Sequence, residues 1–253
     1  EFANVERIDV LKGPAGFLIG RLEPGGMINV ITKKPLDAPY YSLEQQFGSY
    51  DLYRTSIDAS GPLTDNRELL YRLNFSYLNK GSFRDFLDNE RFFVAPSLTW
   101  EPDVDTKFDL TFEYRLETDQ FDSGIPAIGN RPAPVPISRR YDKQPGLDSG
   151  NEVRLVEFNF SHIIVPDWTV RGGFLGSFTN LDQKLIIPFG IRSDNRTIDR
   201  GIFSDQLDGS SIYQQDISAF LDFTGHFELF GTQHTLLVGA DHYEGRSDAA
   251  ELT

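Results

Sequence analysis

Apolar and polar residues alternate through much of this chain. The clearest example runs from Tyr213 to Leu229, where apolar residues occupy most odd positions and polar residues most even ones, with Phe220 as the main exception. Successive side chains of a β-strand point to opposite faces, so a period of two predicts a strand with one apolar face. None of the alternating segments has the period of a helix.

Eight further segments repeat this pattern. They cover residues 41–48, 52–60, 69–77, 91–101, 108–116, 153–163, 168–179 and 234–244. Their lengths suit strands that cross a membrane at a tilt. The sequence therefore predicts an all-β, antiparallel fold with about nine strands after residue 39.

The links between the predicted strands differ in length in a regular way. Short links rich in Gly, Pro and Asp lie at 60–67, 101–106, 165–167 and 230–233, whereas long links lie at 120–150 and 185–211. The exceptions are a tight turn at 48–51 and a moderate loop near 81–90. Outer-membrane barrels have short periplasmic turns and longer external loops. If the chain enters on the periplasmic side near Pro39, every short link falls on that side.

Composition agrees with a barrel that crosses a membrane through strands. No apolar run approaches the roughly eighteen residues of a transmembrane helix, so a membrane role would require a closed barrel. The mean hydropathy of -0.35 is compatible with this, because lumen-facing polar residues offset the lipid-facing ones. The alternative is a β-sandwich, as in a secreted adhesin or carbohydrate-binding module, although long loops on one side only are less expected there.

Charge and residue usage exclude several classes of function. The net charge of -14 and the scattered basic residues argue against nucleic-acid binding. The absence of cysteine excludes disulfides and thiolate metal sites. No nucleophile elbow, dinucleotide fingerprint, phosphate loop or zinc-protease motif occurs, so we assign no catalytic residue, no metal ligand and no cofactor. The protein is not predicted to be an enzyme.

The segment from Val5 to Pro35 has a different sequence pattern, because glycine and proline interrupt short β-prone runs. Glycine permits positive φ or close backbone approach, and proline fixes φ without needing a ladder partner. β-Prone residues flank the turns on both sides, as in V-E-R-I-D-V-L and M-I-N-V-I-T. The residues alone therefore predict two short strands joined by a compact, glycine-rich loop.

The full motif, V-E-R-I-D-V-L-K-G-P followed by E-P-G-G-M-I-N-V-I-T-K-K-P, resembles the end of the plug domain of TonB-dependent outer-membrane receptors, in particular those for ferric siderophores. The resemblance implies that residues 1–38 are the C-terminal part of a plug domain. Residues 39–253 would then be the N-terminal strands of a transmembrane barrel, about nine of the roughly 22 strands of a plugged transporter. On this interpretation the chain is a fragment.

The resemblance also implies a function. Such receptors bind a ferric siderophore outside the cell and import it with energy supplied through TonB, which contacts an N-terminal box absent from this sequence. The expected location is the outer membrane of a Gram-negative bacterium, with outer-membrane lipid around the barrel. A receptor of the same fold for cobalamin, haem or an oligosaccharide remains an alternative, because the plug motif separates these cargoes poorly.

The proline-rich link at 120–150 contains the best candidates for ligand contact. Arg131, Arg139, Arg140 and Tyr141 stand out there in an otherwise acidic protein. Guanidinium groups pair bidentately with carboxylates and stack on aromatic rings, which suits an anionic, oxygen-rich metal chelate. The second long link offers Arg192, Arg196 and Arg200 among acidic residues. Salt bridges within the loops are the alternative for each of these arginines.

The plug segment supplies a second set of candidates. The resemblance directs the loop from Ala15 to Pro24 toward the external side, so that Phe17, Arg21 and Glu23 would border the ligand chamber. Two positions depart from the family: Ile19 replaces a common aromatic residue, and Lys12 replaces an arginine. Lys33 and Lys34 are expected to face carboxylates of the barrel wall, with strands outside this sequence as one possible source of those partners.

Overall fold

The structure, a computed structural model, describes residues 1–13, 25–119, 122–141, 149–182, 184–192, 194, 197–204 and 212–248. All regular elements in these ranges are β-strands. Within the same ranges, no helix is long and apolar enough to cross a membrane.

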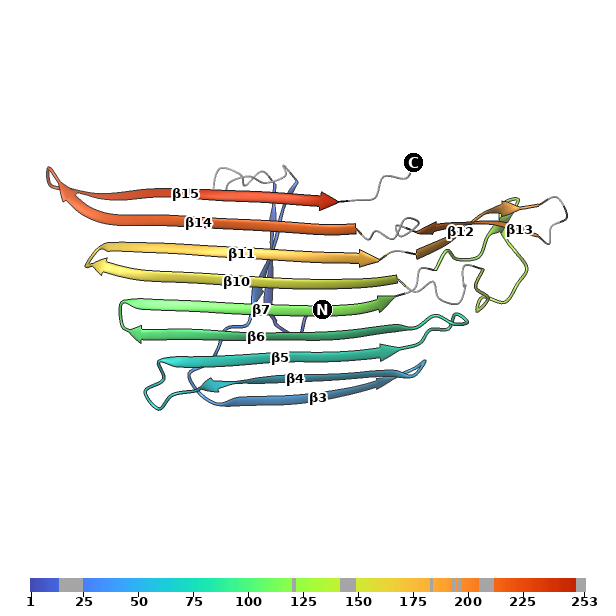
Figure 1. The fold of residues 1–253 in the computed structure, drawn as a ribbon, viewed down its shortest axis with the longest axis horizontal. Helices are drawn as coiled ribbons and strands as arrows, with labels where there is room; N and C mark the ends of the chain where they lie inside the picture. The colour runs from blue at the N-terminus through green and yellow to red at the C-terminus, as the bar shows by residue number, and fades with distance from the viewer. Residues whose placement is uncertain are drawn as a thin grey trace.

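Nine strands form one antiparallel sheet in the order β15-β14-β11-β10-β7-β6-β5-β4-β3 (Figure 1). Their bounds are β3 (Tyr40–Gly48), β4 (Leu52–Pro62), β5 (Leu69–Lys80), β6 (Asn89–Asp103), β7 (Thr106–Asp119), β10 (Ser149–Val165), β11 (Trp168–Asp182), β14 (Ile212–Leu229) and β15 (Thr232–Asp248). Each observed strand contains one of the nine predicted segments. The alternating pattern therefore located every strand of the sheet.

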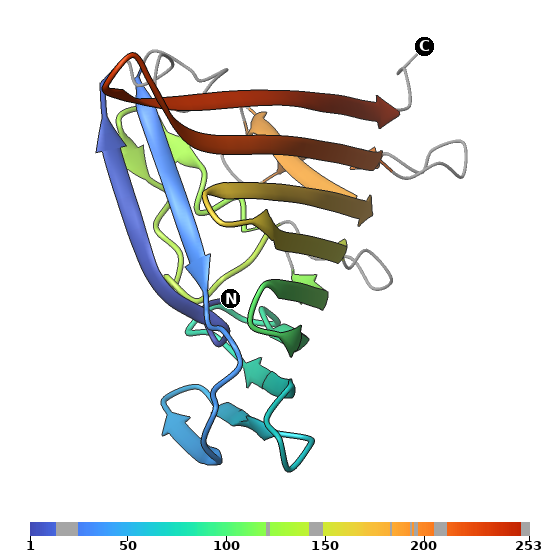
Figure 2. The same cartoon turned by 90° about the vertical axis from the view of Figure 1, so that its left-hand side faces the viewer.

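The sheet is curved and open, so the structure is a partial barrel (Figure 2). Strands β3 and β15 form its two edges and pair on one side only. The β-sandwich alternative is wrong, because no second large sheet packs on this one among the described residues. Its concave face is instead crossed by a two-stranded hairpin.

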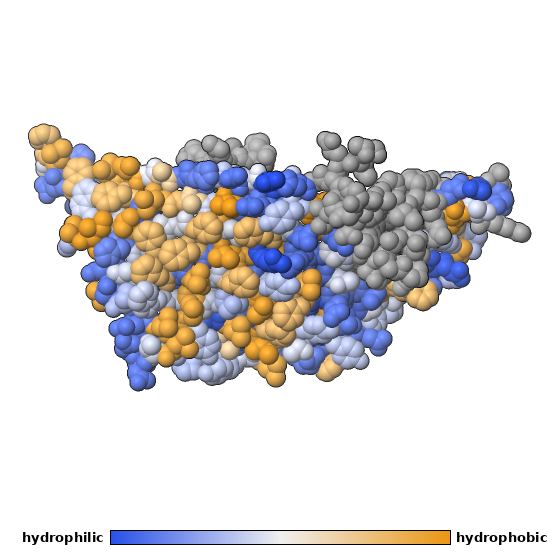
Figure 3. All heavy atoms as spheres, viewed as in Figure 1, coloured by the Kyte–Doolittle hydropathy of each residue, from blue (hydrophilic) through white to orange (hydrophobic). Residues whose placement is uncertain are grey.

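Polar side chains line the concave face, which is the wall of the lumen. On β5, for example, Arg72, Asn74 and Ser76 are buried on this side. The convex face carries apolar and aromatic residues, which Figure 3 shows spread over the strands. Close to the short turns, Trp100 stacks on Phe108 with ring centroids 5.3 Å apart, and rings of this kind form the aromatic girdle of membrane barrels.

Aromatic rings cover glycines on neighbouring strands. On the convex face, a Cβ at Gly225 would overlap the ring of Trp168, its register partner on β11. On the concave face, Phe220 lies opposite Gly173 in register, and a Cβ at Gly173 would overlap its ring. Phe220 breaks the alternation of β14 because it faces the lumen, where Gly173 leaves room for it.

The short and long links lie at opposite ends of the strands (Figure 1). We call the border of the sheet formed by the strand ends with the four short links the turn edge, and the opposite border the loop edge. This confirms the predicted asymmetry. The long links also contain strands that the alternation did not predict, namely β8 (Ala127–Ile128), β9 (Arg131–Pro132), β12 (Lys184–Ile191) and β13 (Ile198–Ser204).

The N-terminal segment forms the hairpin predicted from its glycine-rich pattern. Strands β1 (Val5–Lys12) and β2 (Gly26–Thr32) pair antiparallel and cross the concave face of the sheet (Figures 1 and 2). Gly26 has φ of 125°, and a Cβ there would overlap the carbonyl oxygen of Leu11, so this position requires glycine. A plug that ends at residue 38 stays a prediction.

Candidate functional site

Two long links meet at the loop edge of the sheet. The β8–β9 hairpin belongs to the link between β7 and β10, and the β12–β13 hairpin belongs to the link between β11 and β14. β8 contacts β12, so the two hairpins lie side by side. Figures 1 and 2 together place β8 and β9 beyond the loop edge and on the concave side.

A cavity of about 640 Å³ lies between these hairpins. Its lining residues are Ile128, Arg131, Pro132, Ala133, Pro134, Val135, Tyr141, Ile191 and Ile198. The walls are thus apolar except for one guanidinium and one phenol. This is the usual composition of a small-molecule site, in which a few polar groups orient a ligand within an apolar enclosure.

Local backbone bonds and proline hold the first wall of the cavity. The amide of Ala133 donates to the carbonyl oxygen of Pro126 over 2.9 Å, and the amide of Val135 donates to that of Ala133 over 2.8 Å. Pro132 and Pro134 have fixed φ, which limits the conformations open to this short stretch. The lining is therefore well organised before any ligand binds.

The second wall is the tip of the β12–β13 hairpin. Ile191 and Ile198 are register partners, which places two β-branched residues side by side. Just beyond them, Arg192 forms an ion pair with Asp199 over 2.7 Å. The hydrogen bond to Asp199 raises the pKa of Arg192 above its usual value. For Arg192 the salt-bridge alternative is confirmed, whereas Arg196 and the side chain of Arg200 lie outside the described residues.

The four predicted residues of the first long link divide into two pairs. Arg131 and Tyr141 line the cavity, and Arg131 has no ion-pair partner among the residues that the structure describes. Arg139 and Arg140 do not line it. Arg140 instead donates from Nη1 to the carbonyl oxygen of Phe86 over 2.8 Å, on the link between β5 and β6.

Arg84 is a residue of this site that sequence reasoning missed. Its Nε lies 3.0 Å from a carboxylate oxygen of Asp122, and its Nη1 donates to the carbonyl oxygens of Ile137 and Arg139 over 2.8 and 3.2 Å. Its side chain is only 12% exposed. Arg84 thus fastens the long link to its neighbour, and no local signal marks it because its partners are far away in the sequence.

The three candidates of the plug segment, Phe17, Arg21 and Glu23, lie outside the described residues, so their predicted contact with ligand stays a prediction. In the ranges that the structure describes, no three acidic or histidine residues come close enough together to hold a metal ion.

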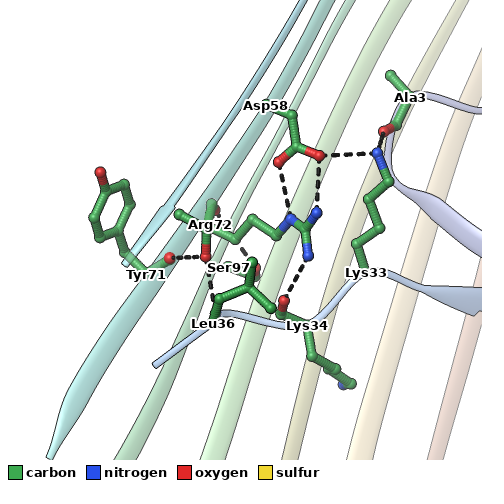
Figure 4. Close-up of polar contacts among 9 residues, drawn as sticks. Ala3, Lys33, Lys34, Leu36, Asp58, Tyr71, Arg72 and Ser97 are labelled. Carbon is green, nitrogen blue, oxygen red and sulfur yellow. Dashed lines mark hydrogen bonds and ion pairs between the residues drawn. The ribbon is translucent and has the colours of Figure 1, made fainter. Parts of the chain in front are cut away.

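An ionic cluster joins the end of the hairpin to the lumen wall (Figure 4). Asp58 on β4 accepts hydrogen bonds from Nε and Nη2 of Arg72 over 2.9 and 2.8 Å, and from Nζ of Lys33 over 2.9 Å. Arg72 also donates from Nη1 to the carbonyl oxygen of Lys34 over 2.8 Å. The predicted wall partner of Lys33 therefore exists, and it lies on a strand of this chain.

Further contacts hold the same segment against the wall. The amide of Leu36 donates to the hydroxyl of Ser60, which is fully buried, over 2.8 Å. At the start of the chain, Asn4 donates to a carboxylate oxygen of Glu113 on β7 over 3.0 Å. Because Val5 and Thr32 are register partners, Asn4 and Lys33 both lie at the open end of the hairpin, and these contacts bind that end to the wall.

The sequence resembles those of several curated transport receptors. It matches no protein-family model. It is 31% identical to the metal-pseudopaline receptor CntO of Pseudomonas aeruginosa (strain UCBPP-PA14), over 97% of this chain and 34% of that protein. It is 25% identical to the ferrichrome outer membrane transporter/phage receptor of Escherichia coli K12, over 96% of this chain and 35% of that protein. The chain thus spans about a third of the length of these relatives, and they are receptors or transporters by name, not enzymes.

Solved structures share the fold. The outer-membrane ferripyoverdine receptor of Pseudomonas aeruginosa, bound to ferripyoverdine, matches with a TM-score of 0.79 and 24% identity, over 97% of this chain and 33% of that one. The siderophore receptor PiuA of Acinetobacter baumannii matches with a TM-score of 0.80 and 20% identity, over 98% of this chain and 36% of that one. Another similar structure is a complex of FpvAI with pyocin S2.

Proposed function

Because this chain belongs to the family of TonB-dependent outer-membrane receptors, we propose that the protein binds a ferric siderophore outside the cell and imports it through its barrel. The protein lies in the outer membrane of a Gram-negative bacterium, with its loop edge outside. The observation that supports the proposal best is the cavity at that edge. It combines apolar walls with a guanidinium that has no ion-pair partner among the described residues, and its hairpins belong to a sheet whose concave face the β1–β2 hairpin crosses.

The residues at this site have separate roles in the proposal. Arg131 and Tyr141 contact the chelate inside the cavity, where a guanidinium can pair with anionic oxygen. Arg139 and Arg140 belong to the same link but do not line the cavity, and Arg140 holds the loop through the carbonyl oxygen of Phe86. The metal arrives inside its chelator, so the protein needs no resident cofactor and no metal ligands of its own.

We infer a second partner from the family. TonB supplies the energy for release, through contact with a box that receptors of this family carry before the plug. The plug then rearranges and opens a path through the lumen. A receptor of the same fold for cobalamin, haem or an oligosaccharide remains the alternative on the cargo side.

Uptake in cells tests the proposal. A strain with this protein as its only such receptor is supplied with radioactive iron as ferric catecholate, hydroxamate or carboxylate chelates, and in parallel with cobalamin, haem and oligosaccharides. We expect uptake of at least one ferric chelate and its loss when TonB is deleted. Uptake of a non-iron cargo alone would overturn the siderophore assignment.

Charge reversal at Arg139 and Arg140 provides a variant for the same assay. We expect R139E/R140E to lower chelate uptake while leaving the amount of folded barrel unchanged, because both residues lie on a loop and not in the sheet. Folded barrel is measured by its gel mobility before and after heating. If uptake by this double variant is undiminished, these two arginines have only a structural role.

A further inference from the structure

The lining of the loop-edge cavity restricts the chemistry of its ligand. Seven of its nine lining residues are aliphatic or proline. Burying a polar group against such walls without a hydrogen bond costs about 1–3 kcal/mol. The part of a chelate that enters must therefore be largely apolar, which disfavours chelators built only from hydroxyl, carboxylate and amide groups.

The charge of the lining residues further restricts the chemistry of the ligand. The chain has 38 acidic residues against 24 basic ones, yet no Asp or Glu among the described residues lines this cavity. Its only full charge is that of Arg131, which pairs with no acid within the described ranges. A planar guanidinium binds anionic oxygens bidentately and also stacks on aromatic rings. The polar end of the ligand must therefore be an anion.

The size and stiffness of the walls favour a flat group. A volume of about 640 Å³ lies within the range of ordinary ligand sites, about 300–1,000 Å³. Pro132 and Pro134 on one side face the Ile191–Ile198 pair of the other hairpin. An apolar wall restricted by proline, a pair of isoleucines and a guanidinium beside them suit an aromatic ring that carries an anionic oxygen.

We propose that the cavity binds an aryl group with an anionic oxygen, of the benzoate or catecholate kind, that forms part of the imported chelate. This inference rests on the proposed function and names the substrate class for that site. Ile191, Ile198 and Pro132 hold the ring and Arg131 pairs with the anionic oxygen, while Tyr141 also lines the cavity.

Binding to the whole receptor in outer-membrane vesicles tests this assignment. The probes are the ferric complex of dihydroxybenzoate, which has the aryl group, and ferric citrate, which has none. Affinity is measured by quenching of intrinsic fluorescence. We expect the aryl complex to bind at least tenfold more tightly than ferric citrate.

Matched variants locate the binding. We expect Ile198→Asp, which places a carboxylate in the cavity, to weaken the aryl complex at least tenfold. Ile137→Asp is the control, because Ile137 is 71% exposed on the first long link and does not line the cavity. If Ile198→Asp fails to assemble, Ile198→Trp tests the same wall by filling the space.

The outcomes separate the two proposals. Equal affinity for both probes, or aryl binding that neither variant of Ile198 weakens, would overturn the aryl assignment while leaving siderophore import intact. A receptor that binds no ferric chelate of any class would overturn the proposed function, and the aryl assignment with it.

Discussion

Asp58 is the acceptor on which the anchor of the β1–β2 hairpin depends, and Asp58→Asn should release that anchor. In the cluster, Asp58 accepts three hydrogen bonds, two from Arg72 and one from Lys33. Its side chain is 12% exposed and that of Arg72 is 8% exposed. The substitution keeps the shape of the side chain but removes its charge and one acceptor oxygen.

The expected cost follows from burial. Removing one partner of a buried ion pair typically costs about 3–5 kcal/mol, because the remaining charge is left uncompensated. Asparagine keeps one oxygen that can accept from Arg72, and Lys33 can turn toward water, so we expect the lower end, about 3 kcal/mol. At about 1.4 kcal/mol per factor of ten, this corresponds to a roughly 150-fold larger population of the released segment.

Trypsin cleavage after Lys33 measures this release. The Lys33–Lys34 bond lies in the anchored segment, and Pro35 protects the next bond from trypsin. When the segment recloses faster than it is cut, the cleavage rate follows the population of the released form. We therefore expect Asp58→Asn in the folded, membrane-embedded receptor to be cleaved roughly 150-fold faster at this bond.

Asp222→Asn is the matched control. Asp222 faces the same lumen and pairs with Arg171 over 3.5 Å, but the side chain of Arg171 is 56% exposed. Exposed pairs contribute about 0–1 kcal/mol, so cleavage after Lys33 should stay within about fivefold of the unmodified protein. If Asp58→Asn behaves like this control, the ionic cluster does not hold the segment and the reasoning is refuted.

Two further substitutions test the sheet and the loops. Gly225→Ala should destabilise the barrel by about 1–3 kcal/mol, because the new Cβ displaces the ring of Trp168. The control is Gly150→Ala, which should have little effect because nothing lies within 4 Å of its Cβ. The measurement is the temperature at which the barrel loses its folded gel mobility, and equal temperatures for the two variants would contradict the packing argument. Arg84→Gln should raise protease cleavage within residues 122–141 at least tenfold, because it breaks the ion pair of a mostly buried side chain; an unchanged rate would show that other contacts hold this loop.

The strands could be predicted because their signal is local. Each strand of the sheet faces lipid on one side and the lumen on the other. The sequence of each strand therefore alternates, whichever strands lie beside it. The main exception within β14, Phe220, could be explained only from the structure. Its ring faces the lumen because Gly173, in register on β11, leaves space that no other residue would leave.

The hairpins of the long links were missed for a related reason. In β12 and β13 the pairing shifts between Pro188 and Gly190, so no long run of alternation marks them. The cavity they help to form depends on the contact of β8 with β12, which joins two links that are far apart in the sequence. Arg131 and Tyr141 could be chosen for their chemistry, but their isoleucine neighbours could not.

The sequence by itself determined the strand pattern, the sidedness of the turns and the family motif, because each depends on residues close together in the chain. Only the tertiary structure decided which charges meet. Lys33 pairs with Asp58, Arg84 fastens a loop that begins far from it, and Arg131 keeps an unpaired guanidinium within the described part of the chain. Curvature of the sheet and packing of the loops bring such groups together, and neither is encoded in local spacing.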